Sequence, residues 1–177
     1  MTIRFSRRHL LSLIPGSALA GCGFQPVYMP TATGKPGPAE RELAAIDVGV
    51  IADRPGQLLR QALQQRLGND AGERRKYDLK VAFWVSGEGI GIGPDNLASR
   101  VRLVGHANWT LSALDTARTP LANGSTRASD GVNVFTAQYF AQDMANEAAT
   151  RRIATAVADQ VALQLALHFR KQAEGSG

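Results

Sequence analysis

Alternating apolar and polar positions predict two long β-strands in the middle of the chain. Over residues 77–86 the odd-numbered positions are apolar or aromatic, and over residues 100–111 valine, leucine, alanine and tryptophan again occupy odd positions. This period of two is typical of strands that bury one face. The segment between them, residues 87–99, is expected to be a loop, so the strands should form an antiparallel pair.

Apolar residues at helical spacing predict one helix on each side of these strands. Leucines between residues 55 and 67 predict the first helix, with Asp53 as its N-cap and Gly68 as its left-handed end. An apolar residue at every fourth position from Ile153 to Phe169 predicts a long final helix over residues 137–170, a stretch without Pro or Gly.

Two further strands complete the predicted fold. Alternate β-branched residues in 46–51 predict a short first strand, and residues 120–130, after a turn at 115–118, predict a more polar last strand. The order is therefore β-α-β-β-β-α. It predicts one α+β domain over residues 46–177, a two-layer sandwich with two helices packed on one face of a four-stranded mixed sheet.

The first 21 residues have the pattern of an export signal. Three arginines precede the apolar run of residues 10–14, and small residues follow it. The apolar run is shorter than the roughly 20 residues that a transmembrane helix needs. Without this segment the basic residues fall to 20 − 3 = 17 against 15 acidic residues, a net charge of +2 instead of +5. So small an excess argues against a nucleic-acid partner.

The segment ends in Leu19-Ala20-Gly21-Cys22, which resembles the bacterial lipobox. In that motif the cysteine is acylated and becomes the new N-terminus. Several acyl chains on Cys22 would anchor the protein stably in a membrane. Gly23 stands where an aspartate would resemble an inner-membrane retention signal, so the outer membrane is the expected location. Residues 22–45, rich in Pro and Gly, are expected to form an extended tether.

The rest of the sequence carries no catalytic or metal-binding motif. Beyond residue 21 there are two histidines, His106 and His168, and neither HExxH nor GxSxG occurs. A single cysteine cannot form an internal disulfide or a thiolate zinc site. The glycines at every second position of 87–93 fit neither common phosphate-loop pattern, and are expected to form a mobile loop or to extend the strands. We therefore expect no enzyme activity, no cofactor and no metal.

The candidate binding surface is the polar face of the two long strands. A symmetric hairpin places Trp84 opposite Arg102, a cation–π arrangement, and any pairing with an even sum keeps the same residues on this face. The same hairpin places Lys80 opposite His106. A tryptophan with neighbouring arginines is typical of a binding hot spot, and basic residues bind lipid phosphates. The alternative is an ordinary solvated surface. The candidate residues are Lys80, Trp84, Arg100, Arg102 and His106.

Three features together suggest a family. The lipobox runs directly into residues 22–28 (CGFQPVY), residues 100–103 (RVRL) begin a strand that ends in residues 109–111 (WTL), and the final helix contains residues 164–169 (QLALHF). With the element order, these features resemble the LptE family of lipopolysaccharide-assembly lipoproteins. The resemblance implies a non-enzymatic lipoprotein that sits inside the outer-membrane LptD β-barrel, helps the barrel to assemble, and binds lipopolysaccharide through basic residues.

Two other classes of function are weighed against this interpretation. One is a lipid-binding auxiliary lipoprotein of an ABC-type transport system, which would hold phospholipid in an apolar pocket. The other is an envelope hydrolase, for which the sequence offers no nucleophile and base. Co-purification distinguishes the auxiliary lipoprotein from an LptE-like protein. A co-purified barrel supports the LptE-like protein, and extractable phospholipid supports the auxiliary lipoprotein.

Overall fold

The computed structural model describes residues 37–68, 74–92, 98–134 and 138–175. The elements are α1 (Pro38–Ala44), β1 (Ile46–Val48), α2 (Asp53–Leu67), β2 (Tyr77–Ile92), β3 (Ala98–Ala113), β4 (Pro120–Asn133) and α3 (Tyr139–Glu174). The predicted export signal, Cys22 and most of the predicted tether lie outside the described residues. None of the described helices is long and apolar enough to span a membrane.

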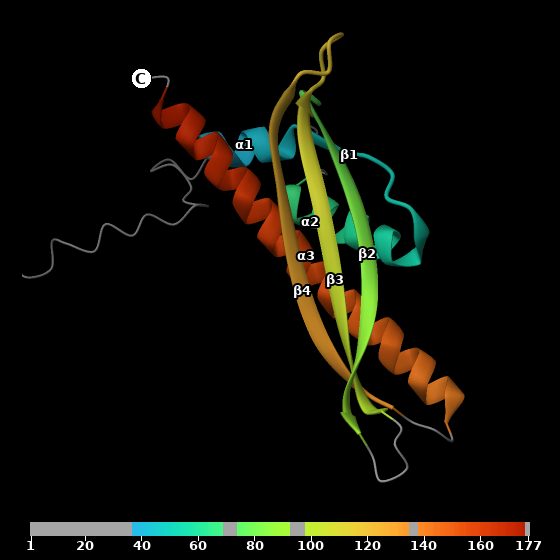
Figure 1. The fold of residues 1–177 in the computed structure, drawn as a ribbon. Helices are drawn as coiled ribbons and strands as arrows, with labels where there is room; N and C mark the ends of the chain where they lie inside the picture. Colours follow the sequence, from blue (N-terminus) through green and yellow to red (C-terminus); the bar gives the residue numbers. More distant parts are fainter. Residues whose placement is uncertain (1–36, 69–73, 93–97, 135–137, 176–177) are drawn as a thin grey trace, which may run out of the picture.

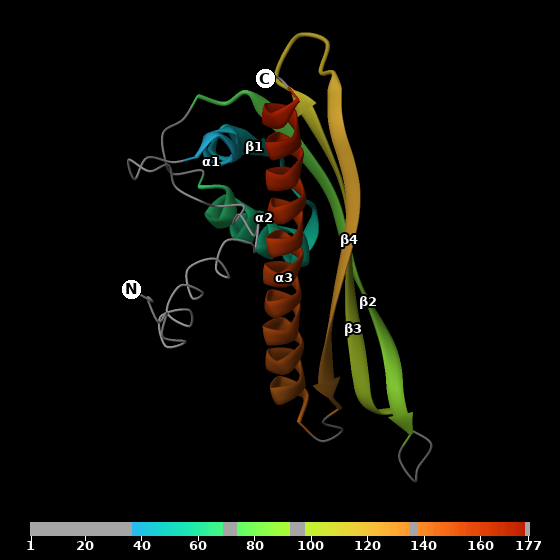
Figure 2. The same ribbon diagram turned by 90° about the vertical axis from the view of Figure 1, so that its left-hand side faces the viewer.

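The strands form one mixed sheet in the order β1-β2-β3-β4. β1 runs parallel to β2, and the other neighbours are antiparallel (Figure 1). The helices lie on one side of this sheet, so the molecule has a strand layer and a helix layer (Figure 2). The predicted α+β class and the order β-α-β-β-β-α are confirmed, with α1 as an additional helix before β1.

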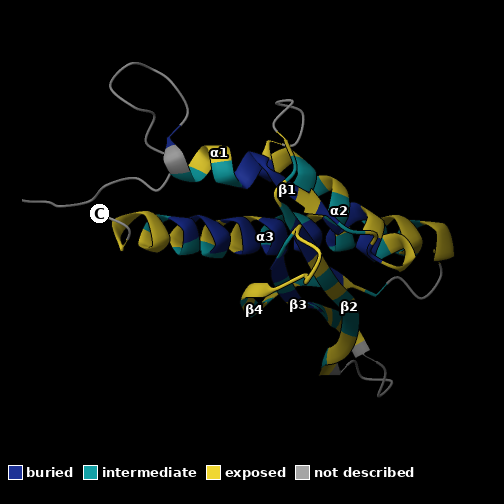
Figure 3. Ribbon diagram, turned by 90° about the horizontal axis from the view of Figure 1, so that it is seen from above, coloured by how far each residue is buried: buried dark blue, intermediate teal, exposed yellow. Residues whose placement is uncertain are grey.

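α3 is the main support of the sheet. Its 36 residues span about 54 Å at 1.5 Å per residue. The predicted apolar ridge is buried from Ala149 through Ile153 to Phe169, and alanines on the neighbouring positions are buried too. Seen from above, α3 is dark blue over much of its length and lies between α1 and the sheet (Figure 3). The small residues allow α2 and the sheet to approach α3 closely, which places the core between the two layers.

α1 corrects the prediction of an extended tether up to residue 45. Pro38 occupies the first turn, and the backbone N–H of Gly37 donates to the Glu40 carboxylate at 3.3 Å. Leu43 is buried in the common core, and α1 packs against α3. The last part of the predicted tether, residues 38–45, therefore belongs to the folded domain.

α2 follows the prediction at its end but not at its start. Gly68 ends the helix in the left-handed conformation, with φ 69°, and its N–H donates to the carbonyl of Gln64. The predicted N-cap is wrong, because Ala52 is the capping residue and no side chain caps the helix. Asp53 is the first residue of the helix and has a positive φ of 64°, a conformation that aspartate tolerates.

The hairpin of β2 and β3 is longer than predicted and pairs differently. Both strands continue through the segment that was expected to be a loop, as far as Ile92 and Ala98, in agreement with the strand-extending interpretation of its glycines. The centre of the hairpin therefore moves. Trp84 pairs with His106 and Lys80 with Thr110, so the predicted partners Arg102 and His106 are wrong. The pairing sum remains even, which preserves the faces.

Candidate binding face of the sheet

All five candidate residues lie on one face of the sheet. Helices cover the opposite face, and we call the uncovered face the outer face. It carries the even-numbered side chains of β2 and β3 and, through the pairing of His106 with Arg127, the odd-numbered side chains of β4. β2 supplies Lys80 and Trp84 to this face. β3 supplies Arg100, Arg102 and His106.

Trp84 stacks on a histidine rather than on an arginine. The rings of Trp84 and His106 are parallel within 11°, with centroids 5.2 Å apart. His106 Nε2 also lies 3.5 Å from the hydroxyl of Ser86, two residues along β2 from Trp84. The predicted cation–π pair of Arg102 with Trp84 is therefore wrong, because the true register places Glu88 opposite Arg102. Trp84 still leaves 48% of its surface exposed.

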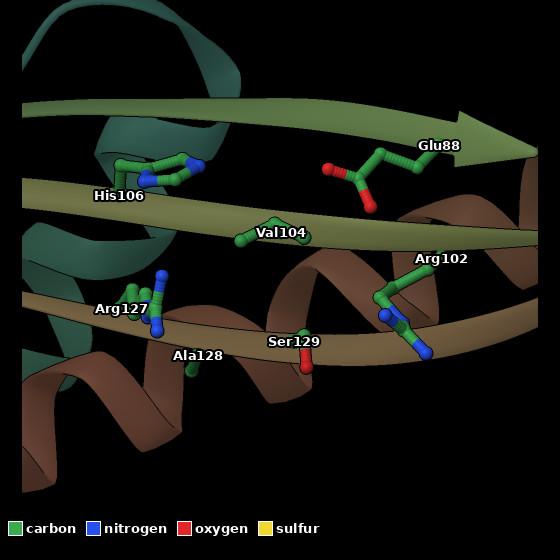
Figure 4. Close-up of a pocket in the computed structure, with 7 residues that line it drawn as sticks. All are labelled: Glu88, Arg102, Val104, His106, Arg127, Ala128 and Ser129. Atoms are coloured by element: carbon green, nitrogen blue, oxygen red, sulfur yellow. The ribbon is translucent and has the colours of Figure 1, made fainter.

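Next to this stack the outer face is hollowed. A depression of about 370 Å³ lies across β2, β3 and β4, between Glu88, Arg102, His106 and Arg127 (Figure 4). Val104 forms its floor at the centre of the view, with Ser129 beside it. Arg127 was not among the predicted candidates. The signal for it was the alternation in residues 120–130, which is weak because the apolar positions there are alanine and glycine.

Arg100 lies across a glycine on the neighbouring strand. A Cβ atom at Gly131 would come within 2.7 Å of Arg100 Nη2 and 2.9 Å of its Nε. Because Gly131 has no side chain, the guanidinium of Arg100 can lie directly over β4 at this position. Arg100 and Arg102 therefore occupy the same half of the outer face, near the hairpin end.

The outer face carries an excess of positive charge. Lys80, Arg100, Arg102 and Arg127 stand on it, and within the described chain none of these four forms an ion pair. Of its carboxylates, Asp78 is engaged by Arg118 at 2.6 Å, which leaves Glu88 and the exposed Asp47, the neighbour of Asp78 on β1, as the available countercharges. Guanidinium groups without partners are the usual ligands for phosphate and carboxylate groups. The face is therefore suited to an anionic ligand.

A second polar cluster joins α1 to β2. Tyr77 donates a hydrogen bond to Glu42 at 2.8 Å, and Lys76 contacts the same carboxylate at 2.9 Å. Burial alone would raise the pKa of Glu42, but these two hydrogen bonds lower it below its ordinary value. Burial and the bond to Glu42 raise the pKa of Tyr77 to about 12. This cluster holds the helix in place and lies apart from the outer face.

The described residues contain no group of three or more His, Cys, Asp or Glu side chains arranged to hold a metal ion. The outer face brings together cations, one aromatic stack and a shallow depression. Such a surface can hold a large anionic ligand or a partner protein.

The fold is shared with bacterial proteins of known structure. A protein from Caulobacter crescentus CB15 aligns with a TM-score of 0.61 and 24% identity, over 75% of this chain and 96% of its own. The rare lipoprotein B of Shewanella oneidensis aligns with a TM-score of 0.52 and 10% identity, over 73% and 98%. A minor lipoprotein of Acinetobacter baumannii gives 0.50 and 11%, over 69% and 90%. At these identities the likeness shows the fold.

The sequence identifies the family. The family model described as LptE, lipopolysaccharide-assembly, matches residues 43–165, which is more than half of the chain. This chain therefore belongs to the LptE family, as the resemblance of its sequence predicted. The comparison with curated proteins gives no match.

Proposed function

We propose that this chain is a non-enzymatic outer-membrane lipoprotein that plugs and helps to assemble the LptD barrel and takes part in the insertion of lipopolysaccharide into the outer leaflet. Membership of a lipopolysaccharide-assembly family supports the process. The observation that carries the binding role is the outer face, with four cations that have no ion-pair partner within the described residues. Lipopolysaccharide is an anionic glycolipid whose phosphates match such a surface.

The basic residues of the outer face are the proposed contacts to the anionic groups. Arg100 and Arg102 lie near the hairpin end, and Arg127 lines the depression beside His106. Lys80 stands near the start of β2, away from the hairpin end. Trp84 offers an exposed ring between Lys80 and the depression. We propose that phosphates bind the arginines while Trp84 covers the adjacent part of the ligand.

A charge reversal tests this assignment. Arg100→Glu with Arg102→Glu should weaken binding of purified lipopolysaccharide by at least about a hundredfold, since two contacts of roughly 1.5–3 kcal/mol each are lost. Both side chains are exposed, so the thermal unfolding temperature should stay close to that of the unmodified chain. The matched control is Arg41→Glu with Lys171→Glu, which changes the net charge equally but on the helix layer. Equal binding by both double variants would refute the site.

Lipid anchoring is tested at Cys22. We propose that its acylated thiol holds the protein at the outer membrane, facing the periplasm and the barrel lumen. Cys22→Ser should therefore fractionate as a soluble periplasmic protein when no barrel partner is present. A Cys22→Ser variant that remains in the membrane fraction without the partner, or a mature protein with an unmodified residue 22, would contradict this part of the proposal.

A further inference from the structure

β2 has a long edge to which no strand is bound within the described part of the chain. β1 pairs with β2 at residues Tyr77–Leu79 alone, and one further bond joins the N–H of Gly49 to the carbonyl of Leu79 at 3.0 Å. Beyond this point β2 continues to Ile92 with β3 as its neighbour on the other side. The edge of β2 from Lys80 onward is therefore open (Figure 1).

The direction of the free backbone groups follows from the pairing. Leu79 directs its carbonyl toward β1, and in a strand the backbone groups of successive residues alternate between the two sides. No register shift interrupts the pairing of β2 with β3 between Leu79 and Ile90. The N–H and C=O groups of Val81, Phe83, Val85 and Gly87 must therefore point to the open edge.

The other edge of the sheet is protected. α3 runs beside β4, and the side chain of Gln164 donates to the backbone carbonyl of Ser125 at 3.4 Å. On the helix-covered face of β4, the side chains of Thr126 and Asp130 bond to Gln160 and Arg152 and so hold α3 along this strand. β4 also begins with a proline, which is common on edges that do not pair. Within the described residues these three bonds are made to β4 and not to β2, and the two edges therefore differ in availability.

The place where β1 leaves the sheet is hollow, and its lining includes the cation Lys80 and the carboxylate Asp78. A depression of about 530 Å³ lies there, lined among others by Gly49, Val50, Lys80 and Asn108. Val50 is 89% exposed. The ammonium of Lys80 has no ion-pair partner among the described residues, whereas the nearby carboxylate of Asp78 is held by Arg118. A carboxylate on an added strand would be complementary to Lys80 at this point.

We propose that the open edge of β2 binds an extended segment of the partner protein as an additional strand of the sheet. The segment carries an acidic side chain on the outer-face side, next to Lys80. It carries apolar side chains on the other side, beside the half-buried Val81, Phe83 and Val85. This inference rests on the proposed function, because it takes the LptD barrel as the partner. The strands of a closed barrel pair with each other, so a loop or terminal segment supplies the added strand.

Gly87 allows a test that removes one edge donor and little else. Its N–H points to the open edge, so Gly87→Pro deletes a bond to the added strand while the pairing with β3 is retained. A Cβ at this position would lie 3.4 Å from Val101 and 3.5 Å from Leu103, which is ordinary contact, so Gly87→Ala is the matched control. Each tagged full-length variant is co-expressed with LptD, and the barrel captured from detergent-solubilised membranes is quantified.

Gly87→Pro should lower the captured barrel by about tenfold, while Gly87→Ala should capture as much as the unmodified chain. Equal capture by Gly87→Pro would overturn the edge proposal and leave the proposed function intact. Failure of the unmodified chain to capture LptD would overturn both. A concentration-dependent dimer that Gly87→Pro abolishes would show that a second copy occupies the edge, and would also overturn the proposal.

Hydrogen exchange decides the matter if Gly87→Pro fails to fold. In the free unmodified chain the amides of Val81, Phe83 and Val85 should exchange faster than those of Ala82 and Trp84, which bond to β3. In the complex with LptD the odd-numbered amides should become protected to the level of the even-numbered ones. Odd-numbered amides that stay fast in the complex would overturn the proposal.

Discussion

Trp84 offers a prediction whose size follows from its exposure. The ring stacks on His106 but leaves 48% of the residue exposed, so its contribution to the stability of the free protein is limited. Trp84→Ala should lower the free energy of unfolding by about 1 kcal/mol, the scale of a single aromatic pair. A larger loss would mean that the ring belongs to the core.

Its contribution to binding should be larger. A tryptophan offers roughly 200 Å² of apolar surface, so about half, ~100 Å², remains for a ligand or partner to cover. At ~25 cal/mol per Å² this burial is worth about 2.5 kcal/mol, or roughly a seventyfold change in Kd. Titration of purified lipopolysaccharide into the folded Trp84→Ala variant measures this change directly.

The control removes a side chain of similar exposure from the helix layer. Leu163 on α3 is 43% exposed and lies away from the outer face. Leu163→Ala should therefore leave the Kd for lipopolysaccharide unchanged within about twofold. If Trp84→Ala binds as tightly as Leu163→Ala, the outer face does not cover its ligand at this position and the reasoning from exposure is refuted.

Three further predictions concern stability. Gly105→Ala should lower the free energy of unfolding by about 1–3 kcal/mol, because its Cβ would lie 2.3 Å from Cγ2 of the buried Ile153. Chemical denaturation measures this loss. In the Ile153→Ala background the same Gly105→Ala change should cost less stability, and an equal cost in both backgrounds would contradict the clash. The carboxylate of Glu42 has a lowered pKa, so its stabilisation is full above the unfolded value of 4.5 and is lost as the pH falls through the folded value. Glu42→Gln should remove this acid-side dependence, and an unchanged pH profile of thermal unfolding would contradict it. Tyr77 acts in the opposite direction, since its raised pKa makes stability fall as the pH rises from 10.0 toward about 12.

The long elements could be predicted because their patterns are repeated many times. Alternation from Tyr77 to Val85 and the ridge from Ile153 to Phe169 each fix a period and a buried face, and both faces are confirmed. The outer face followed from the same alternation, since a change of register by an even number of residues leaves it intact. This is why the five candidate residues share a face although their predicted partners were wrong.

The remaining features depend on contacts that no local pattern contains. The hairpin register was misplaced because the glycines up to Gly91 look like a loop, whereas pairing with β3 holds them in the strand. α1 was missed because a helix of only seven residues is too short to be stable from local sequence signals and depends on burying Leu43 in the core. Arg127 was missed because the small residues around it give a weak alternation. In each case tertiary packing outweighed local composition.

Isolation of the native complex from outer membranes tests the central claim most directly. The tagged, full-length chain is purified under conditions that preserve its complexes, and the bound protein and lipid are identified. We expect to recover a heat-modifiable β-barrel, LptD, together with lipopolysaccharide. Recovery of extractable phospholipid and components of an ABC-type transporter, without a barrel, would contradict it and support the auxiliary lipid-binding function instead.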